Sequence, residues 1–147
     1  MKIWMNARST VPSRHAWAAG RDASLRYGAI DGQGSAYVVG GTNSADYPTT
    51  PGAFQTTFGG PCCDGFVSKL SPDGSSLAYS TYLGGSGSGG GNSGNDWALS
   101  VAVDQNGHAF VGGFTGSPNF PVTPGAFQTS FPASPAWYTV SGFVTEL

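Results

Sequence analysis

The chain has 147 residues, of which 10% are charged, and its formal net charge of −2 gives no electrostatic reason to expect binding to nucleic acid or to an anionic membrane surface. No apolar run approaches the ~18 residues that span a membrane. Apolar residues make up 39% of the chain, enough for a core despite 24 glycines and 10 prolines, so the composition favours a folded domain over disorder.

The N-terminal residues 1–5 begin like a secretory signal, with a lysine followed by apolar side chains. Asn6 and Arg8 interrupt this stretch before ~7 apolar residues accumulate, so we expect no signal peptide in the chain as it stands. Beyond residue 26, short apolar runs alternate with Gly, Asn, Asp and Pro turn signals, which is typical of antiparallel strands. The predicted strands are residues 27–31, 35–42, 65–70, 77–83, 98–104, 108–115 and 142–147.

An internal repeat divides these strands into two sets. Residues 31–58 align without a gap to residues 104–131, and 16 of the 28 positions are identical. After an insertion of four residues, the match resumes between residues 65–70 and residues 142–147. A repeated unit of four short antiparallel strands is typical of a propeller blade, which cannot bury its two faces alone.

We therefore predict an all-β chain, residues 1–147, that forms a single unit of two β-propeller blades with four-stranded antiparallel sheets. Blade one spans about residues 27–83, and blade two spans about residues 98–147.

Three segments of the repeat resemble the bacterial SBBP β-propeller repeat. They are Pro-Gly-Ala-Phe-Gln at 51–55 and again at 124–128, Gly-Phe-Val at the start of each third strand, and Tyr-Ser-Thr-Tyr-Leu-Gly-Gly at 79–85. The resemblance covers about residues 27–147 and implies a propeller in a large secreted or cell-surface bacterial protein. The family brings no established catalytic residues, so the resemblance assigns none here.

The strand count predicts a permuted order within the two blades. With the strands of a blade named A to D, blade one supplies all four, whereas blade two supplies A, B and C. The repeat offset places residues 4–7 opposite residues 77–80, so residues 3–7 are the candidate D strand of blade two. Pairing this segment with residues 142–147 would protect an open strand edge. The predicted order is D-ABCD-ABC.

Two blades cannot close a ring, so we expect homo-oligomerisation to complete it. Three chains would give six blades, and this homotrimer is the preferred arrangement. A tetramer with eight blades and a dimer with four blades are the alternatives.

The connections at one end of the predicted strands are long, at about residues 8–26, 43–64, 84–97 and 116–141, and irregular segments of this kind commonly carry function. Aromatic side chains stack on sugar rings, so they favour a glycan or other polyhydroxylated ligand. The predicted ligand-binding residues are Trp17, Arg21, Trp97, Trp137 and Tyr138. The structural alternative is that Trp97 and Trp137 pack between blades.

Acidic and histidine side chains on the same long connections are the candidates for catalysis. If the chain is an enzyme, the acid and base candidates are His15, Asp22, Asp64 and Asp96. Asn92, Asn95 and Asp96 offer oxygen donors for calcium, but their spacing matches no calcium loop, and a flexible linker is the simpler interpretation. The sequence assigns no metal site and predicts no cofactor.

Other repeated or paired residues have structural interpretations. Asp31 and Asp104 precede equivalent turns and are expected to cap them, which leaves His108 at the end of the blades opposite the long connections. Phe54 and Phe127 are expected to anchor the long connections that follow each second strand. The adjacent Cys62 and Cys63 fit a turn, a pair of reduced thiols or a strained vicinal disulfide.

These observations favour a non-catalytic binding module for a glycan or an extracellular partner, because His, Glu and Lys are scarce on the long connections. The alternative is a glycosidase-like hydrolase with its site at the mouth of a central channel formed between chains. A third interpretation is a propeller fragment with no function of its own. By the family resemblance, the expected location is extracellular or at the cell surface.

Overall fold

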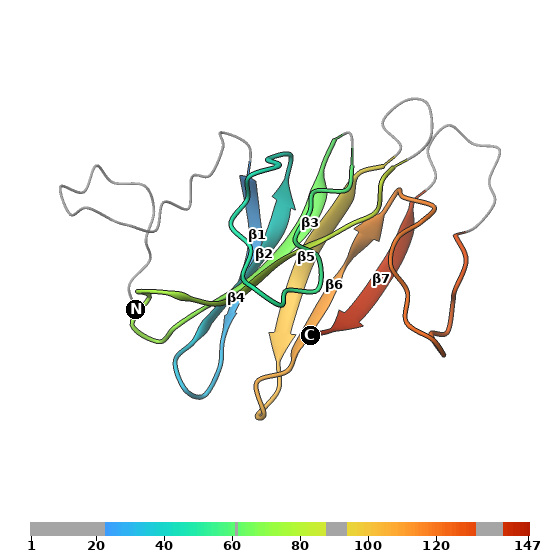
Figure 1. The fold of residues 1–147 in the computed structure, drawn as a ribbon. Helices are drawn as coiled ribbons and strands as arrows, with labels where there is room; N and C mark the ends of the chain where they lie inside the picture. Colours follow the sequence, from blue (N-terminus) through green and yellow to red (C-terminus); the bar gives the residue numbers. More distant parts are fainter. Residues whose placement is uncertain (1–22, 61, 88–93, 132–139) are drawn as a thin grey trace.

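The computed structural model describes residues 23–60, 62–87, 94–131 and 140–147, which form two antiparallel β-sheets and no helix (Figure 1). The first sheet contains, in order, β1 (Ala23–Ile30), β2 (Ala36–Thr42), β3 (Asp64–Leu70) and β4 (Leu77–Leu83). The second contains β5 (Asp96–Val103), β6 (Ala109–Thr115) and β7 (Ser141–Glu146). The prediction of an all-β chain is confirmed, and among the described residues there is no helix that could cross a membrane.

The strand bounds differ from the predicted ones mainly at the first strand of each sheet. β1 begins at Ala23 and β5 at Asp96, both earlier than predicted, and each continues past a register shift, between Leu25 and Tyr27 and between Ala98 and Ser100. A bulge lets a strand bend and continue pairing, and a sequence pattern of period two does not reveal it. The predicted closing strand, residues 3–7, lies outside the described residues.

The two sheets pack face to face, with β5 lying against β1, β2 and β3 (Figure 1). The buried residues at this contact come from both sheets and are Tyr37, Val39, Val67, Leu83, Ala98, Val101, Ala109 and Val111. Burial of a valine-sized side chain stabilises a fold by roughly 1.5–3 kcal/mol. The main hydrophobic core therefore lies between the two repeats rather than within either one.

A second cluster joins the connection between β2 and β3 to the outer face of the first sheet. The Tyr47 ring lies 4.5 Å from that of Phe66, and its hydroxyl oxygen lies 2.9 Å from Ser68 Oγ. The second sheet repeats the contact, because Phe120 stacks on Phe143 at 4.6 Å. These pairs fix where each long connection crosses its sheet.

The prediction that Phe54 and Phe127 anchor these connections is wrong, since both side chains are exposed. The residue that anchors the first connection besides Tyr47 is Gln55, whose carbonyl accepts a hydrogen bond from Tyr82 N–H (3.0 Å). Thr50 N–H likewise donates to the Ser80 carbonyl at 3.0 Å. Main-chain groups rather than the phenylalanine ring hold this segment, and they cover the outer edge of β4.

Candidate functional site

Connections of very different length leave the two ends of the sheets. The loop edge is formed by residues 43–63, 84–95 and 116–140, which connect β2 to β3, β4 to β5 and β6 to β7. The turn edge is formed by residues 31–35, 71–76 and 104–108, the short turns at the opposite end (Figure 1). Because the pairs Thr42–Asp64 and Asp96–Thr115 are in register, all three long connections leave from the same end.

Six of the predicted site residues lie outside the described residues. They are His15, Trp17, Arg21, Asp22, Trp137 and Tyr138. Their assignments as ligand-binding or catalytic residues stay predictions. The described candidates are Asp64, Asp96 and Trp97, and all three lie at the loop edge, at the first residues of β3 and β5.

Trp97 is half-buried where the two sheets meet. A Cβ placed on Gly41 of β2 would lie 2.6 Å from the indole ring, so only glycine at this position leaves room for the ring to approach the backbone. The Arg26 guanidinium carbon lies 4.7 Å from the ring centroid, within the range of a cation–π contact. Trp97 therefore contacts β1 and β2 of the other sheet.

Asp64 is fully buried at the first residue of β3. Its Oδ2 accepts a hydrogen bond from Gly59 N–H at 2.7 Å and a longer one from Gln55 Nε2 at 3.4 Å. Its Oδ1 has no hydrogen-bond partner among the described residues. Burial is the main factor that raises the pKa of Asp64 to about 6, and the nearby Asp96 carboxylate raises it further. The hydrogen bond from Gly59 N–H acts in the opposite direction and lowers it.

Asp96 is equally buried at the first residue of β5. Its Oδ2 accepts hydrogen bonds from Gly85 N–H at 2.7 Å and from Ser117 Oγ at 2.8 Å. Its Oδ1 is buried without a partner among the described residues, as is Oδ1 of the preceding Asn95. The carboxylate thus links the β4–β5 connection to the β6–β7 connection.

The structure brings the two carboxylates together beside Gly84. A Cβ placed on Gly84 would lie 2.5 Å from Asp64 Oδ1 and 2.9 Å from Asp96 Oδ2. A parallel bridge between Cys63 and Asn95, with Asp96 N–H donating to the Cys63 carbonyl at 2.9 Å, holds the ends of β3 and β5 side by side. In the hydrolase alternative, Asp64 and Asp96 would act as acid and base and would have to touch a substrate. Both residues are 0% exposed, which does not favour this role.

Sequence reasoning missed the residues that support this pair, namely Gln55, Gly84 and Ser117. Gln55 Oε1 accepts a hydrogen bond from Gly84 N–H at 3.0 Å, while its amide nitrogen faces Asp64. The sequence signal for Gln55 is the repeated Pro-Gly-Ala-Phe-Gln motif, in which the phenylalanine rather than the glutamine is the predicted anchor. The glutamine recurs as Gln128, whose Nε2 donates to the Ser130 carbonyl just as Gln55 Nε2 donates to Thr57.

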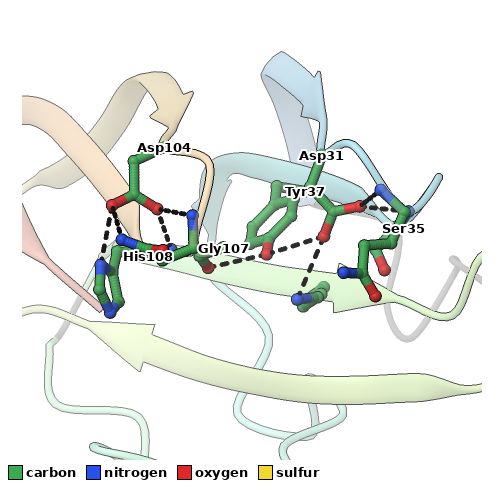
Figure 2. Close-up of polar contacts among 9 residues, drawn as sticks. Asp31, Ser35, Tyr37, Asp104, Gly107 and His108 are labelled. Atoms are coloured by element: carbon green, nitrogen blue, oxygen red, sulfur yellow. Dashed lines mark hydrogen bonds and ion pairs between the residues drawn. The ribbon is translucent and has the colours of Figure 1, made fainter.

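The turn edge carries a different polar network, built around Asp31 (Figure 2). Asp31 Oδ1 accepts hydrogen bonds from Gln33 and Ser35 N–H, both at 2.9 Å, which confirms the predicted cap. Its Oδ2 lies 3.3 Å from Lys69 Nζ. Burial alone would raise the pKa of Asp31, but these hydrogen bonds and Lys69 together lower it to about 2.

Asp104 caps the equivalent turn of the second sheet, and its Oδ1 accepts from Asn106 and His108 N–H, both at 2.8 Å (Figure 2). His108 Nδ1 lies 2.9 Å from Asp104 Oδ2, so this histidine is at the turn edge, as predicted. Tyr37 joins the two turns, since its hydroxyl lies 2.9 Å from the Gly107 carbonyl oxygen and 3.2 Å from Asp31 Oδ2. These contacts are structural and leave His108 away from the buried carboxylates.

Metal ligands and thiols are two further types of site that the sequence raises. No group of three or more His, Cys, Asp or Glu side chains suited to a metal ion occurs within the described ranges. Cys62 and Cys63 are both thiols, with Sγ atoms 2.9 Å apart. Besides these two thiols, the polar groups described at the loop edge include oxygen acceptors from carboxylates, amides and main-chain carbonyls.

Comparisons with protein-family models, curated proteins and solved structures gave no match to this chain.

Proposed function

We propose that the chain is a two-blade unit of a β-propeller that acts as a non-catalytic binding module, with its ligand at the loop edge. The observation that carries this proposal is the asymmetry of the connections, because residues 43–63, 84–95 and 116–140 all leave the same end of the sheets. Binding residues occur disproportionately on such segments when a rigid sheet positions them. The extracellular or cell-surface setting is part of the same proposal.

The ligand class follows from the side chains that the loop edge carries. Trp137 and Tyr138 belong to the longest of these connections, and an indole or phenol ring presents an apolar face to a sugar ring. The exposed carboxylate of Asp46 and the main-chain carbonyl oxygens of the loop edge can accept hydrogen bonds from hydroxyl groups, which suits a neutral glycan better than an anionic one. An extracellular protein partner is the other ligand that such a surface accommodates.

The binding experiment uses neutral hexose oligosaccharides as probes, with uronate oligosaccharides as the anionic comparison. We expect titration with a neutral probe to shift the amide resonances of residues 43–60 and 116–131 and to leave those of residues 31–35 and 104–108 unchanged. Trp137→Ala should weaken binding by tenfold or more, since loss of an aromatic stack costs roughly 1–3 kcal/mol in comparable sites. His108→Ala at the turn edge is the control. Resonance shifts confined to the turn edge would contradict the proposal.

Closure of the propeller by further copies of the chain completes the proposal. The face of the first sheet that carries Tyr37 and Val67 is covered by the second sheet, and both residues are 0% exposed. The repeat places Phe110 and Val144 at the equivalent positions of the second sheet, where they are 39% and 80% exposed. An apolar sheet face of this kind is stabilised when another sheet covers it.

The first sheet presents the complementary surface. Ala98 and Val111 of the second sheet pack on the first sheet, and both are 0% exposed. The residues equivalent to Ala98 and Val103 are Leu25 and Ile30, which are exposed on the outer face of the first sheet. A second copy of the chain could pack on this one in the same way that the second sheet packs on the first. It would cover one open sheet face and leave the other face for a further copy. Such a head-to-tail contact gives a closed ring when the rotation closes, and the homotrimer is the arrangement we favour.

A further inference from the structure

The buried carboxylates of Asp64 and Asp96 have no positive partner among the described residues. The ion pairs of the described chain join Lys69 to Asp31 and His108 to Asp104 and Glu146, all at the turn edge. Removing a carboxylate from water is costly unless a cation, a proton or a full set of hydrogen bonds compensates it. Here two fully buried carboxylates approach the same glycine, Gly84, from different sheets.

Each of these carboxylates is only half satisfied. The Oδ2 atoms accept hydrogen bonds from Gly59 and Gly85 N–H, both at 2.7 Å, so the protein holds both groups in fixed orientations. The Oδ1 atoms of Asp96 and Asn95 are buried and have no donor among the described residues. Asp64 Oδ1 likewise has no donor with hydrogen-bond geometry, although the main chain of Gly60 lies close enough to the carboxylate to lower its pKa. Buried hydrogen-bond acceptors are nearly always paired in folded proteins. Three acceptor oxygens without a donor at the neighbouring ends of β3 and β5 therefore require an explanation.

Main-chain carbonyl oxygens complete a set of oxygen donors around Asp64. A Cβ placed on Gly60 would lie 3.2 Å from Asp64 Oδ1 and 3.6 Å from the carbonyl oxygens of both Gly85 and Gly94. Three oxygen atoms therefore lie on the same side of Gly60, where a residue with a side chain would have placed its Cβ. Donors of this kind, which include carboxylate, amide and carbonyl oxygens, are those that Ca²⁺ takes at 2.3–2.6 Å in groups of six to eight.

We propose that Asp64 and Asp96, together with the carbonyl oxygens of Gly85 and Gly94, form a calcium site where the two sheets meet at the loop edge. The proposed ligands are all oxygen atoms, whereas transition metals prefer nitrogen and sulfur ligands. Ca²⁺ accommodates irregular oxygen sets more readily than Mg²⁺, which requires near-octahedral geometry.

The acidic pair occurs once among the described strand ends, although the fold repeats. The residues equivalent to Asp64 and Asp96 are Ser141 and Ala23, so the repeat does not carry the acidic pair. A bound ion would connect β3 to β5 and also hold the described ends of the β4–β5 connection, residues 84–87 and 94–95. Its predicted effect is to stabilise the packing of the two sheets and the loop edge, and it does not depend on which ligand the loop edge binds.

The test uses the whole chain, after treatment with a chelator, and the metal alone as the probe. Calcium titration should show one binding event per chain, and saturating Ca²⁺ should raise Tm by roughly 5–10 °C at about one hundred times the Kd. Terbium, a calcium substitute, should show luminescence sensitised by Trp97, which is adjacent to Asp96, and Ca²⁺ should displace it. Mg²⁺ should give a smaller rise in Tm.

Asp64→Asn and Asp96→Asn should each abolish the calcium-dependent rise in Tm and lower terbium binding at least tenfold. Both variants keep an oxygen acceptor and remove a buried charge, so we expect them to fold. Asp73→Asn at the turn edge is the control and should behave like the unchanged chain. If the two carboxylates instead share a proton, Ca²⁺ will leave Tm unchanged and mild acid will raise it, and this result would overturn the proposal. Calcium-dependent stabilisation that persists in both variants would also overturn it.

Discussion

Val67 and Val144 stand at equivalent positions of the two repeats, yet Val67 is 0% exposed and Val144 is 80% exposed. Val67 belongs to β3, which β5 of the second sheet covers. No described element covers the same face of β7. The contact between the two sheets of one chain is thus a direct guide to the contact that a second copy would make.

The first prediction concerns this open face. Val144→Asp should lower the mass of the particle in solution while the β-sheet circular dichroism stays unchanged, because a carboxylate is costly to bury between sheets but harmless in water. Val140→Asp is the matched control, since Val140 is also exposed but precedes β7 at the loop edge. Equal loss of mass in both variants, or in neither, would contradict the assignment of this face.

The second prediction concerns the hydroxyl group that joins the two turns. Tyr37→Phe removes the hydrogen bond to the Gly107 carbonyl and should lower the free energy of unfolding by roughly 0.5–1.5 kcal/mol. Tyr79→Phe is the matched control, because the Tyr79 hydroxyl is buried without a partner among the described residues and its removal should be neutral or stabilising. Urea unfolding of the two variants tests this, and the reverse order of stability would show that the Tyr37 bond contributes nothing.

The third prediction concerns the close approach at Gly84. Gly84→Ala would place a Cβ 2.5 Å from Asp64 Oδ1 and 2.6 Å from its Cγ, so we expect a loss of roughly 1–3 kcal/mol in stability. A Cβ on Gly32 meets nothing within 4 Å, and Gly32→Ala should therefore be tolerated. Thermal unfolding compares the two substitutions. Equal Tm values would mean that the buried carboxylates are less closely packed around Gly84 than described.

The fourth prediction is a dependence of stability on pH through Asp31. Its folded pKa of about 2 lies below the ordinary value of 3.8, so the ionised group stabilises the fold above pH 4. That contribution is lost as the pH falls from about 4 towards 2. Asp31→Asn keeps an oxygen for the turn but removes the charge, so the difference in urea midpoint between the two proteins should shrink over this range. A difference that stays constant with pH would exclude this role.

The turn edge was largely predictable from the sequence because its interactions are local. An aspartate followed three residues later by glycine encodes both the capped turn and the left-handed backbone, and Gly34 and Gly107 indeed share a φ of 89°. The seven strands were predictable for the same reason, since alternation and turn residues are read within a few positions.

The loop edge was not predictable in the same way, because its contacts join residues far apart in the chain. From the sequence, Asp64 and Asp96 are expected to be exposed residues on long connections, because charged side chains are rarely fully buried. Their burial follows from the packing of β5 on the first sheet, which no local pattern encodes. Phe54 was misinterpreted for a related reason, since the segment around it is held by main-chain hydrogen bonds to β4.

We propose that further copies of the chain cover the two open sheet faces and complete a closed ring. Multi-angle light scattering of the purified 15.0 kDa chain tests it most directly. We expect a single particle whose mass is a small whole-number multiple of the chain mass, three chains being favoured, and a return to the chain mass for Val144→Asp. A well-folded single chain at all accessible concentrations, or an open-ended distribution of sizes, would contradict it.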